Sequence, residues 1–245
     1  MARVRTVMIT GATGGIGRAI TLSLAKQGYN TIVCYNKNQS VAEELVIEAK
    51  KYSNSIAIQA DLSKGSEIDD CFKTARQYFG KIDTLVTCAG VAHYQAFQDM
   101  TEEDFDYLTD TNFKSTALTI SRAIPDMLKL GFGRIVAITS IWGEVGGSGE
   151  VLYSATKSAI SGLVKALAKE LAPSSITVNA IAPGVVDTSM LDHFSNSDKD
   201  YLLSQIPVGR FCSPEEVASL VSHVISDDAS YLTGQIIRLT GGFGE

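Results

Sequence analysis

Residues that commonly hold a metal or a disulfide framework are few in this sequence. The four cysteines, Cys34, Cys71, Cys88 and Cys212, lack C-x-x-C spacing. The three histidines, His93, His193 and His223, form no H-E-x-x-H pattern. Scattered cysteines favour reduced thiols over a disulfide framework and indicate a cytoplasmic protein. Because the ligand residues do not cluster, we expect no metal site.

Long hydrophobic runs and an excess of positive charge are also missing. No apolar stretch approaches the ~20 residues that a membrane-spanning helix needs. The formal net charge is −6 over 245 residues, which argues against a nucleic-acid-binding protein that neutralises phosphates. The chain starts directly with an apolar pattern at 4–10, so we expect no secretory signal peptide. We therefore predict a soluble protein with neither a membrane nor a nucleic acid as its partner.

Short apolar runs alternating with longer amphipathic stretches are abundant. Seven runs are rich in Val, Ile and Leu, at 4–10, 31–35, 55–60, 83–90, 133–140, 176–183 and 234–242. Six helical patterns lie between or after them, at 15–28, 40–52, 66–80, 116–130, 151–172 and 213–225. Near-continuous apolar runs are typical of parallel strands that are covered on both faces.

This alternation predicts an α/β fold, a single-domain doubly wound (Rossmann-type) seven-stranded parallel sheet with helices on both faces. The chain shows no internal repeat, low-complexity tract or linker, so we expect residues 1–245 to form one domain. The least regular stretch, 184–212, is expected to form a mobile substrate-side region of loops and short helices.

A glycine-rich turn follows the first predicted strand and opens the first predicted helix. The turn reads TGATGGIG from Thr10 to Gly17, with Gly11, Gly15 and Gly17 in G-x-x-x-G-x-G spacing. Glycines allow backbone N–H groups to approach a pyrophosphate, and the helix dipole favours the negative charge. We predict dinucleotide binding by this turn, including the intervening residues Thr13, Gly14 and Ile16.

Tyr153 and Lys157 lie four positions apart on a predicted helix, and therefore on one face. An arbitrary pair of this kind more often packs on a solvated surface. Reduction of a ketone by hydride, however, produces an alkoxide that needs a proton, and a phenol with a pKa of ~10 is a weak donor at neutral pH. An ammonium at about 4 Å in an effective dielectric near 20 would stabilise the phenolate by about 4 kcal/mol, or roughly three pKa units. The pair therefore predicts a proton donor tuned by a lysine.

Two polar residues have both a catalytic and a structural interpretation. Ser140 ends a predicted strand, at the sheet edge where α/β proteins bind ligands, and its hydroxyl could donate to a substrate oxygen. A lone serine there is otherwise a helix cap or a turn residue. Asn112 in TDTNFKST, taken alone, indicates a helix cap or kink.

Together these motifs resemble the short-chain dehydrogenase/reductase family, whose signature is T-G-x-x-x-G-x-G, and the similarity runs along the whole chain. The resemblance implies the catalytic residues Asn112, Ser140, Tyr153 and Lys157, with Asn112 holding a water that links Lys157 to solvent. It implies further cofactor-binding residues at the strand ends, with Asp61 near the adenine and Thr188 near the carboxamide; they are Asp61, Leu62, Ala89, Gly90, Pro183, Gly184, Val186 and Thr188. Tyr153 and Lys157 would also contact the cofactor.

The end of the second predicted strand bears on the choice of nicotinamide cofactor. An acid there would bind the ribose 2′-hydroxyl of NAD and repel the phosphate of NADP. This chain has Tyr35, Asn36 and Lys37 and no acid nearby, so we predict NADPH, with Asn36 and Lys37 in its site; NADH is the alternative.

Within the family the chain resembles the 3-oxoacyl-[acyl-carrier-protein] reductases, through FGRIVAITS, ITVNAIAPGVVDTSM and LTGQIIRLTGG. That branch binds acidic carrier protein through arginines before the fifth and sixth strands. Here only Lys129 and Arg134 lie close by. A second departure is Cys88, where the family has an asparagine that fixes the central sheet.

Three alternatives for the function stay open. Trp142, Glu144 and Glu150 are unusual for the branch and could favour a cationic or amine-bearing substrate, although acids on loops are usually solvated. The segment SIWG…EVLYSA also resembles reductases assigned to a 5-aminopentanone group on a lysine of elongation factor P. A non-catalytic NADP-binding scaffold is the alternative of another class.

Self-association is a further expectation from the resemblance. The predicted helix 151–172 carries apolar residues beyond those that one core face requires: Leu163, Val164, Leu167 and Leu171. Family members usually pair such helices, so a homotetramer is expected.

Overall fold

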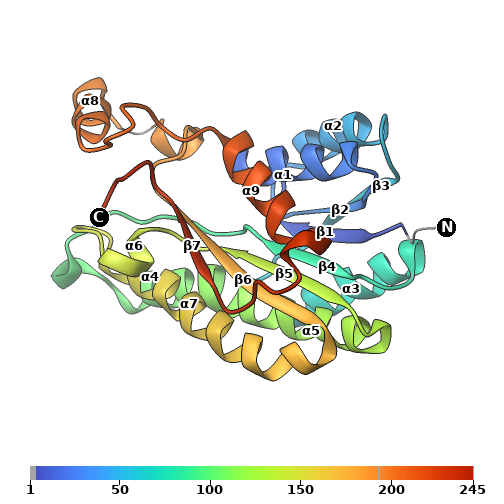
Figure 1. Ribbon diagram of the computed structural model, residues 1–245. Helices are drawn as coiled ribbons and strands as arrows, with labels where there is room; N and C mark the ends of the chain where they lie inside the picture. The colour runs from blue at the N-terminus through green and yellow to red at the C-terminus, as the bar shows by residue number, and fades with distance from the viewer. Residues whose placement is uncertain (1–3, 193, 245) are drawn as a thin grey trace.

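The computed structural model describes residues 4–192 and 194–244, so His193 lies outside the described residues. Its centre is a parallel sheet of seven strands in the order β3-β2-β1-β4-β5-β6-β7 (Figure 1). The strands are β1 (Thr6–Thr10), β2 (Asn30–Tyr35), β3 (Ser55–Gln59), β4 (Thr84–Thr87), β5 (Gly133–Ile138), β6 (Ile176–Pro183) and β7 (Ile236–Leu239). The strand order reverses between β1 and β4, and doubly wound sheets bind ligands at the carboxyl ends of the strands beside such a reversal.

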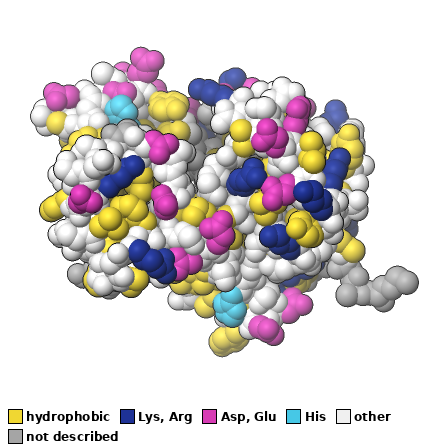
Figure 2. Space-filling view, turned by 90° about the horizontal axis from the view of Figure 1, so that it is seen from above, with side chains coloured by type: hydrophobic (Ala, Val, Ile, Leu, Met, Phe, Trp, Pro, Cys, Tyr) yellow, Lys and Arg dark blue, Asp and Glu magenta, His cyan; other side chains and the backbone are white. Residues whose placement is uncertain are grey.

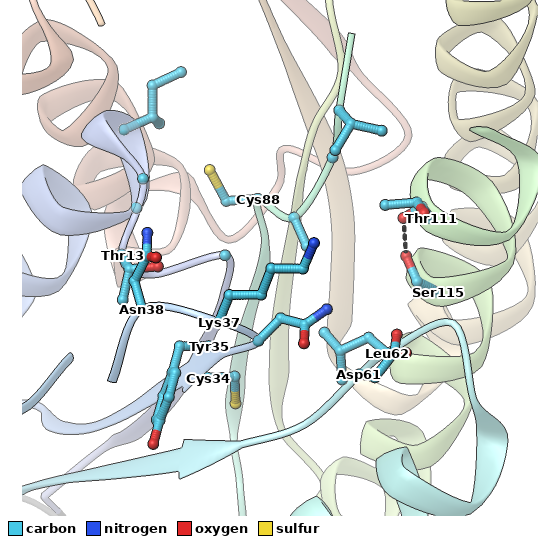
Figure 3. A pocket seen from close by; sticks show the side chains of 18 of the residues that line it. Thr13, Cys34, Tyr35, Lys37, Asn38, Asp61, Leu62, Cys88, Thr111 and Ser115 are labelled. Atoms are coloured by element: carbon cyan, nitrogen blue, oxygen red, sulfur yellow. Dashed lines mark hydrogen bonds between the residues drawn. The ribbon is translucent and has the colours of Figure 1, made fainter. Parts of the chain in front are cut away.

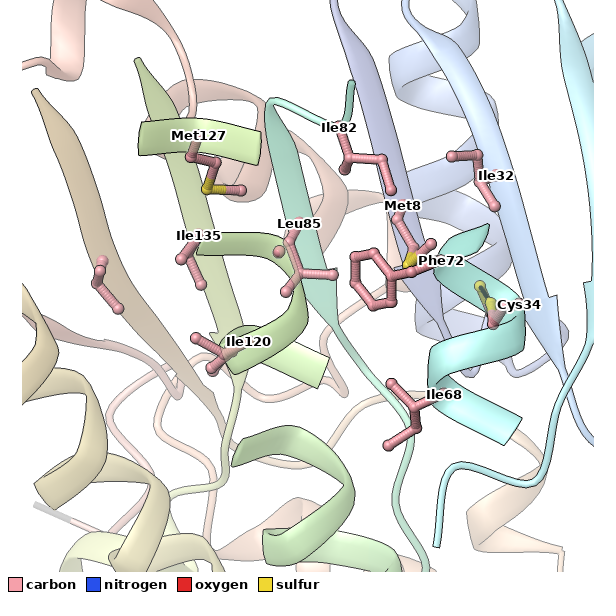
Figure 4. Packing of buried hydrophobic residues seen from close by; sticks show 14 of the residues in the cluster. Met8, Ile32, Cys34, Ile68, Phe72, Ile82, Leu85, Ile120, Met127 and Ile135 are labelled. Atoms are coloured by element: carbon pink, nitrogen blue, oxygen red, sulfur yellow. Dashed lines mark hydrogen bonds between the residues drawn. The ribbon is translucent and has the colours of Figure 1, made fainter. Parts of the chain in front are cut away.

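Two sets of long helices cover the two faces of the sheet (Figure 1). One face carries α1 (Gly15–Lys26), α2 (Gln39–Ala49) and α9 (Pro214–Val224), and the other carries α3 (Gly65–Phe79), α5 (Ser115–Leu130) and α7 (Val151–Leu171). Each layer has its own apolar core against the sheet. In the second core, Phe72 of α3 packs with Met8, Ile32 and Leu85 of the strands (Figure 4). The predicted seven-stranded α/β fold with helices on both faces is confirmed.

Several short elements connect the long ones. They are η1 (Phe97–Asp99), α4 (Glu102–Leu108), the π-helical turn η2 (Thr109–Lys114), α6 (Trp142–Val145), η3 (Ala172–Ser174), η4 (Ser189–Leu191), α8 (Asn196–Ser204) and η5 (Asp227–Ala229). Of these, η4 and α8 fall in the 184–212 region, where short helices were expected. A bridge between Val186 and Cys212 ties the two ends of that region together.

The surface agrees with the acidic composition. On the face seen in Figure 2, lysine and arginine side chains alternate with aspartate and glutamate, and no extended basic area is visible there. Among the described residues, no helix is both long and apolar enough to cross a membrane.

One expectation about α7 is wrong. Val164 and Leu171 are not in excess of the core, because they are 0% and 3% exposed and belong to the core beneath the sheet. Leu163 and Leu167 are only half-buried and pack against the margin of that core. The interior of this single chain therefore already uses two of the four residues.

Candidate active site

A cavity of about 690 Å³ opens at the carboxyl ends of β1, β2 and β4 (Figure 3). Its volume lies in the range of small-molecule and cofactor sites. Thirteen of the predicted cofactor-binding residues line it: Gly11, Thr13, Gly14, Gly15, Ile16, Gly17, Asn36, Lys37, Asp61, Leu62, Ala89, Gly90 and Thr188. The structure thus brings together the glycine-rich turn and three strand ends that are far apart in the sequence.

The glycine-rich turn is shaped for close approach. Gly11 has a φ of +61°, and a Cβ there would come within 2.7 Å of the Cα of Ala89. A Cβ on Gly15 would come within 2.7 Å of Thr188 Cγ2. The first turn of α1 contains no acidic residue, so the free N–H groups and the dipole at this helix end favour an anion. These features fit the pyrophosphate of a dinucleotide.

The far end of the cavity is built from the chain segments that follow β2 and β3. Tyr35, Lys37 and Asn38 line it on one side and Asp61 on the other (Figure 3). The Oδ1 atom of Asp61 accepts hydrogen bonds from the backbone N and the hydroxyl of Ser63, at 3.1 and 2.7 Å. The hydroxyl contact is the main reason why the pKa of Asp61 is lowered. Asp61 is therefore a fixed, ionised acceptor at this end.

Ser140, Tyr153 and Lys157 meet beside the end of β5. The Ser140 hydroxyl acts on the phenol of Tyr153 and lowers its pKa. The backbone N–H of Trp142 donates to Ser140 Oγ at 3.2 Å, which leaves the serine proton available for donation. Lys157 Nζ donates to the Ile138 carbonyl at 3.2 Å and lies 5.6 Å from the centre of the Tyr153 ring. Ser140 is therefore a turn residue, as its structural interpretation predicted, and it also acts on the phenol of Tyr153.

The structure does not show the expected lowering of the Tyr153 pKa by Lys157. The pKa of Tyr153 is raised to about 12, chiefly because burial destabilises the phenolate, while the hydrogen bond from Ser140 opposes this rise. Burial likewise lowers the pKa of Lys157 to about 8. The ammonium points at a carbonyl rather than at the phenol oxygen, so desolvation outweighs the attraction that the spacing suggested.

Asn112 occupies the π-helical turn η2, which fits the prediction of a kink residue. Its Oδ1 accepts from the Val91 N–H at 2.8 Å, and its Nδ2 donates to the Val91 carbonyl at 3.0 Å and to Thr156 Oγ1 at 3.2 Å. Both amide protons are therefore used to fix the loop after β4 against α7. A water held for Lys157 stays a prediction.

The catalytic candidates adjoin the cavity through Gly90. A Cβ at Gly90 would lie 3.2 Å from both Asn112 Oδ1 and Lys157 Nζ, so these groups stand directly behind the cavity wall. Cys88 lines the same wall, where burial raises its pKa to about 11 and the charge of Lys157 opposes the rise. The thiol thus fills the place of the family's asparagine as an un-ionised group.

The unusual aromatic and acidic residues after Ser140 have structural partners. Trp142 packs edge-on against Phe243, with ring centres 5.4 Å apart. Glu144 forms an ion pair with Arg238 at 3.4 Å. Glu150 precedes α7, and its charge contributes to the raised pKa of Tyr153. Of these three residues, Glu150 is the one whose charge acts on the candidate proton donor Tyr153.

Besides Tyr153 and Lys157, three predicted cofactor residues lie outside the cavity lining: Pro183, Gly184 and Val186. The Pro183 carbonyl accepts from the Ile141 N–H at 2.9 Å, and the Gly184 N–H donates to the Leu239 carbonyl at 2.9 Å. Val186 is buried in the core on the α1 side. These residues support the segment that carries Ser140 and Thr188, and their contact with a cofactor stays a prediction.

The structure also adds residues that the sequence analysis missed. The lining includes side chains from β2 to α5 and from η4: Cys34, Tyr35, Asn38, Ala60, Ser63, Cys88, Val91, Tyr107, Asp110, Thr111, Ser115, Ser189 and Met190. Four of them come from α4, η2 and the start of α5, where no helix was predicted before residue 116. A signal was present, because Thr101 and Asp104 form a capping box that starts α4.

Comparison with known proteins agrees with this geometry. Residues 11–244 match the family model described as enoyl-(acyl carrier protein) reductase. The 3-oxoacyl-[acyl-carrier-protein] reductase FabG of Staphylococcus epidermidis is 41% identical over 239 residues, covering 97% of this chain and 98% of the relative. FabG of Staphylococcus aureus is 40% identical over 243 residues and 99% of both chains. The uncharacterized oxidoreductase YmfI of Bacillus subtilis is 41% identical over 244 residues and 98% of both chains. The chain therefore belongs to the short-chain dehydrogenase/reductase family and is an oxidoreductase similar to the 3-oxoacyl-[acyl-carrier-protein] reductases.

Proposed function

We propose that this protein uses NADPH to reduce the ketone of a 3-oxoacyl-[acyl-carrier-protein] to a secondary alcohol. The observation that carries the chemistry is the grouping of Ser140 and Tyr153 with buried Lys157, whose Nζ stands directly behind the cavity wall at Gly90. The substrate class rests on the 3-oxoacyl-[acyl-carrier-protein] reductases, which are similar over nearly the full chain.

The nicotinamide ring, when bound, supplies the hydride. Ser140 donates a hydrogen bond to the carbonyl oxygen of the substrate and keeps its own proton; this bond orients the ketone and stabilises the charge that develops there. Tyr153 then gives its phenolic proton to the same oxygen. This transfer is downhill even with the pKa of Tyr153 at about 12, because an alkoxide is a stronger base than a phenolate.

Lys157 stabilises the Tyr153 phenolate that this proton transfer produces. Its pKa of about 8 keeps most of the lysine protonated near neutral pH, so a positive charge stands beside the phenolate as it forms. The Ile138 carbonyl and the ring of Tyr153 hold Nζ in this place. The lysine thus acts on the phenolate produced during turnover rather than on the resting phenol.

Activity is tested by following NADPH oxidation with acetoacetyl-acyl-carrier-protein and with a small acetoacetyl thioester. We expect oxidation above background with both, and Tyr153→Phe should lower turnover by about 10²- to 10⁴-fold while cofactor binding stays nearly unchanged. The matched control is Tyr231→Phe, because the Tyr231 side chain is fully exposed. Unchanged turnover in Tyr153→Phe would remove the phenol from the mechanism.

The NADPH half of the proposal rests on the chain after β2. Asn36 and Lys37 line the cavity, and no carboxylate follows Tyr35 to repel a 2′-phosphate. We expect Lys37→Gln to raise the KM for NADPH by about 10-fold, the effect of losing one charge-assisted hydrogen bond, and to change the KM for NADH much less. Lys50→Gln, an exposed lysine after α2, is the control. A preference of the wild-type protein for NADH would contradict the proposal.

A second candidate is the reduction of an amine-bearing ketone attached to a protein side chain. The observation in its favour is that Arg134, one of two cations near the expected carrier-protein docking region, is 4% exposed and donates to the Gly133 and Ser175 carbonyls. It is therefore not available to an acidic partner, whereas Lys129 is exposed. In addition, the negative charge of Glu150 acts near the reaction site.

Comparing the rates at which two ketones are reduced distinguishes the two substrate classes. A neutral 3-oxoacyl thioester reduced faster than a 5-aminopentanone-bearing peptide supports the first, and the reverse order supports the second. A third outcome, tight NADPH binding with no turnover of any ketone, would indicate the non-catalytic scaffold. Retention of Asn112, Ser140, Tyr153 and Lys157 argues against that outcome.

A further inference from the structure

Two buried cysteines touch each other beneath the cofactor cavity. Cys34 of β2 and Cys71 of α3 are 37 residues apart in the sequence, and their Sγ atoms are 3.5 Å apart. They are 1% and 2% exposed, and neither takes part in the mechanism above. Figure 4 shows Cys34 beside the helix that carries Ile68 and Phe72.

The pair is connected to the cavity through Cys34. This residue is part of the cavity lining, next to Tyr35 (Figure 3). A molecule as small as hydrogen peroxide in the cavity would therefore be close to the pair despite its burial. Cys71 is not part of the lining and packs with Cys34, Ile68 and Phe72 in the apolar core.

We propose that Cys34 and Cys71 are a redox-active dithiol, which a peroxide oxidises to a disulfide and which bound dinucleotide shields. The shielding rests on the proposed cofactor site, whereas the oxidation of the free protein does not. In the first step, the thiolate of one cysteine attacks the peroxide, forming a sulfenic acid and releasing hydroxide, which takes up the thiol proton to give water. In the second, the sulfur of the other cysteine displaces water from the sulfenic acid and forms the S–S bond. Overall, two thiols and one hydrogen peroxide give one disulfide and two waters.

The contact also favours one thiol as the nucleophile. The hydrogen bond between the two sulfurs lowers the pKa of Cys71 and raises that of Cys34. Thiolate character favours reaction with peroxide, so this contact favours attack by Cys71, whereas the position of Cys34 in the cavity lining favours attack by Cys34; the disulfide is the same from either start.

Oxidation should weaken cofactor binding. A disulfide requires the sulfurs to approach to about 2.05 Å, so β2 and α3 must draw together unless the side chains rotate enough to close the gap. The Cys34 carbonyl accepts the Ala12 N–H at 3.1 Å, which ties the end of β2 to the glycine-rich turn. A shift of Cys34 therefore moves the turn and the residues that follow β2, both of which line the cavity.

The test treats the full chain with hydrogen peroxide, with and without NADP⁺, and maps peptides under non-reducing conditions. We expect a linked Cys34–Cys71 peptide whose mass is lower by two hydrogen atoms, formed more slowly with NADP⁺ and reversed by dithiothreitol. In Cys71→Ala the linked peptide should be absent, and in Cys212→Ala, a cysteine distant in sequence and outside the pair, it should form as in the wild type. The peptide map of the wild-type protein shows whether the disulfide forms, so the test does not depend on the folding of a variant.

NADPH binding is then measured by fluorescence on reduced and oxidised protein. We expect the Kd to rise by about 10-fold on oxidation and to return with dithiothreitol. No linked peptide in wild-type protein, or an unchanged Kd in the linked form, would overturn the redox proposal. A linked peptide that forms equally fast with saturating NADP⁺ would overturn the shielding. A reduced protein that binds no NADPH would instead contradict the proposed function, while the linked peptide would still stand.

Discussion

Lys157 is a cation kept inside the protein, 5% exposed, with its Nζ hydrogen-bonded to the Ile138 carbonyl. Burial lowers its pKa to about 8 from the ordinary value of 10.5. Between these two pH values the unfolded chain therefore binds more protons than the folded protein. The free energy of unfolding consequently rises with pH across this window, and the full penalty for burying the charge is present below pH 8.

Replacing this lysine should stabilise the fold while it removes activity. We expect Lys157→Met to raise the free energy of unfolding near pH 7 by about 1–3 kcal/mol. The lowering of the lysine pKa by roughly two units or more accounts for this gain, and the loss of the hydrogen bond to the Ile138 carbonyl reduces it. The gain should shrink as the pH rises from about 8 toward 10. Tyr153 titrates still higher and is common to both proteins, so it does not reverse this trend.

Guanidinium unfolding of both proteins at pH values of about 7 and about 9.5 measures the gain in the free energy of unfolding at each pH. Lys165→Met, an exposed lysine on the same helix, is the control and should change stability little at either pH. An equal gain at both pH values would mean that Lys157 is not penalised for its charge.

The sequence predicted most of the residues that were expected to bind the cofactor and that line the cavity, but it did not predict how the side chains of the catalytic candidates are oriented. The spacing of Tyr153 and Lys157 shows that they share a helix face, yet it does not show where Nζ points. That direction depends on the Ile138 carbonyl, which belongs to a strand distant in sequence. The same limit applies to Asn112, whose amide is used by Val91 and Thr156.

Long apolar runs predicted the sheet and the main helices, whereas short polar elements escaped detection. The helix before α5 begins at Glu102 and passes through the π-helical turn at Thr109–Lys114, which interrupts the ordinary helical period. Helix α6 spans only four residues, too few for a periodic pattern. The last strand was predicted as 234–242 but is Ile236–Leu239, because Gly234, Gly241 and Gly242 adopt positive φ and form turns. Of the missed elements, α4 and η2 supply Tyr107, Asp110 and Thr111 to the cavity wall.

The contact between α6 and α7 positions Lys157. A Cβ at Gly143 of α6 would lie 2.8 Å from the Lys157 carbonyl carbon and 3.0 Å from the Ser158 N. From the other side, the Thr139 hydroxyl donates to the Lys157 carbonyl at 2.9 Å. The backbone of the lysine is thus held between β5 and α6, and glycine is required for this approach.

We expect Gly143→Ala to lower turnover by about 10- to 100-fold, because α6 must lift away and Lys157 shifts with it. The KM for NADPH should change much less, and the pH profile of turnover should move because the environment of the lysine changes. Gly65→Ala at the start of α3 is the matched control, since its new Cβ meets only Leu118 Cδ1 at 3.9 Å. Wild-type turnover and pH profile in Gly143→Ala would show that this contact does not position the lysine.

The molecule as a whole leaves the outer side of α7 exposed after both cores are filled. Its exposed positions include small residues, among them Ala155, Gly162 and Ala166. Phe105 of α4 and Leu128 of α5 are also about half exposed. Small residues allow two helices to approach closely, so a pair of α7 helices from two copies fits this surface better than the leucine contacts that the sequence suggested.

Gly162 offers a direct test of a homotetramer built on such pairing. A Cβ at Gly162 would meet nothing within 4 Å, so Gly162→Arg fits the single chain, and replacing a mid-helix glycine should raise helix stability by up to about 1 kcal/mol. An arginine there would nevertheless prevent close pairing of two α7 helices. We expect the wild-type protein to have the mass of four chains in light scattering at micromolar concentration, and Gly162→Arg to dissociate into smaller species without unfolding. Ile47→Arg on α2, where the side chain is 66% exposed on the opposite helix layer, should keep the wild-type mass. If Gly162→Arg keeps that mass as well, the subunits do not assemble through α7.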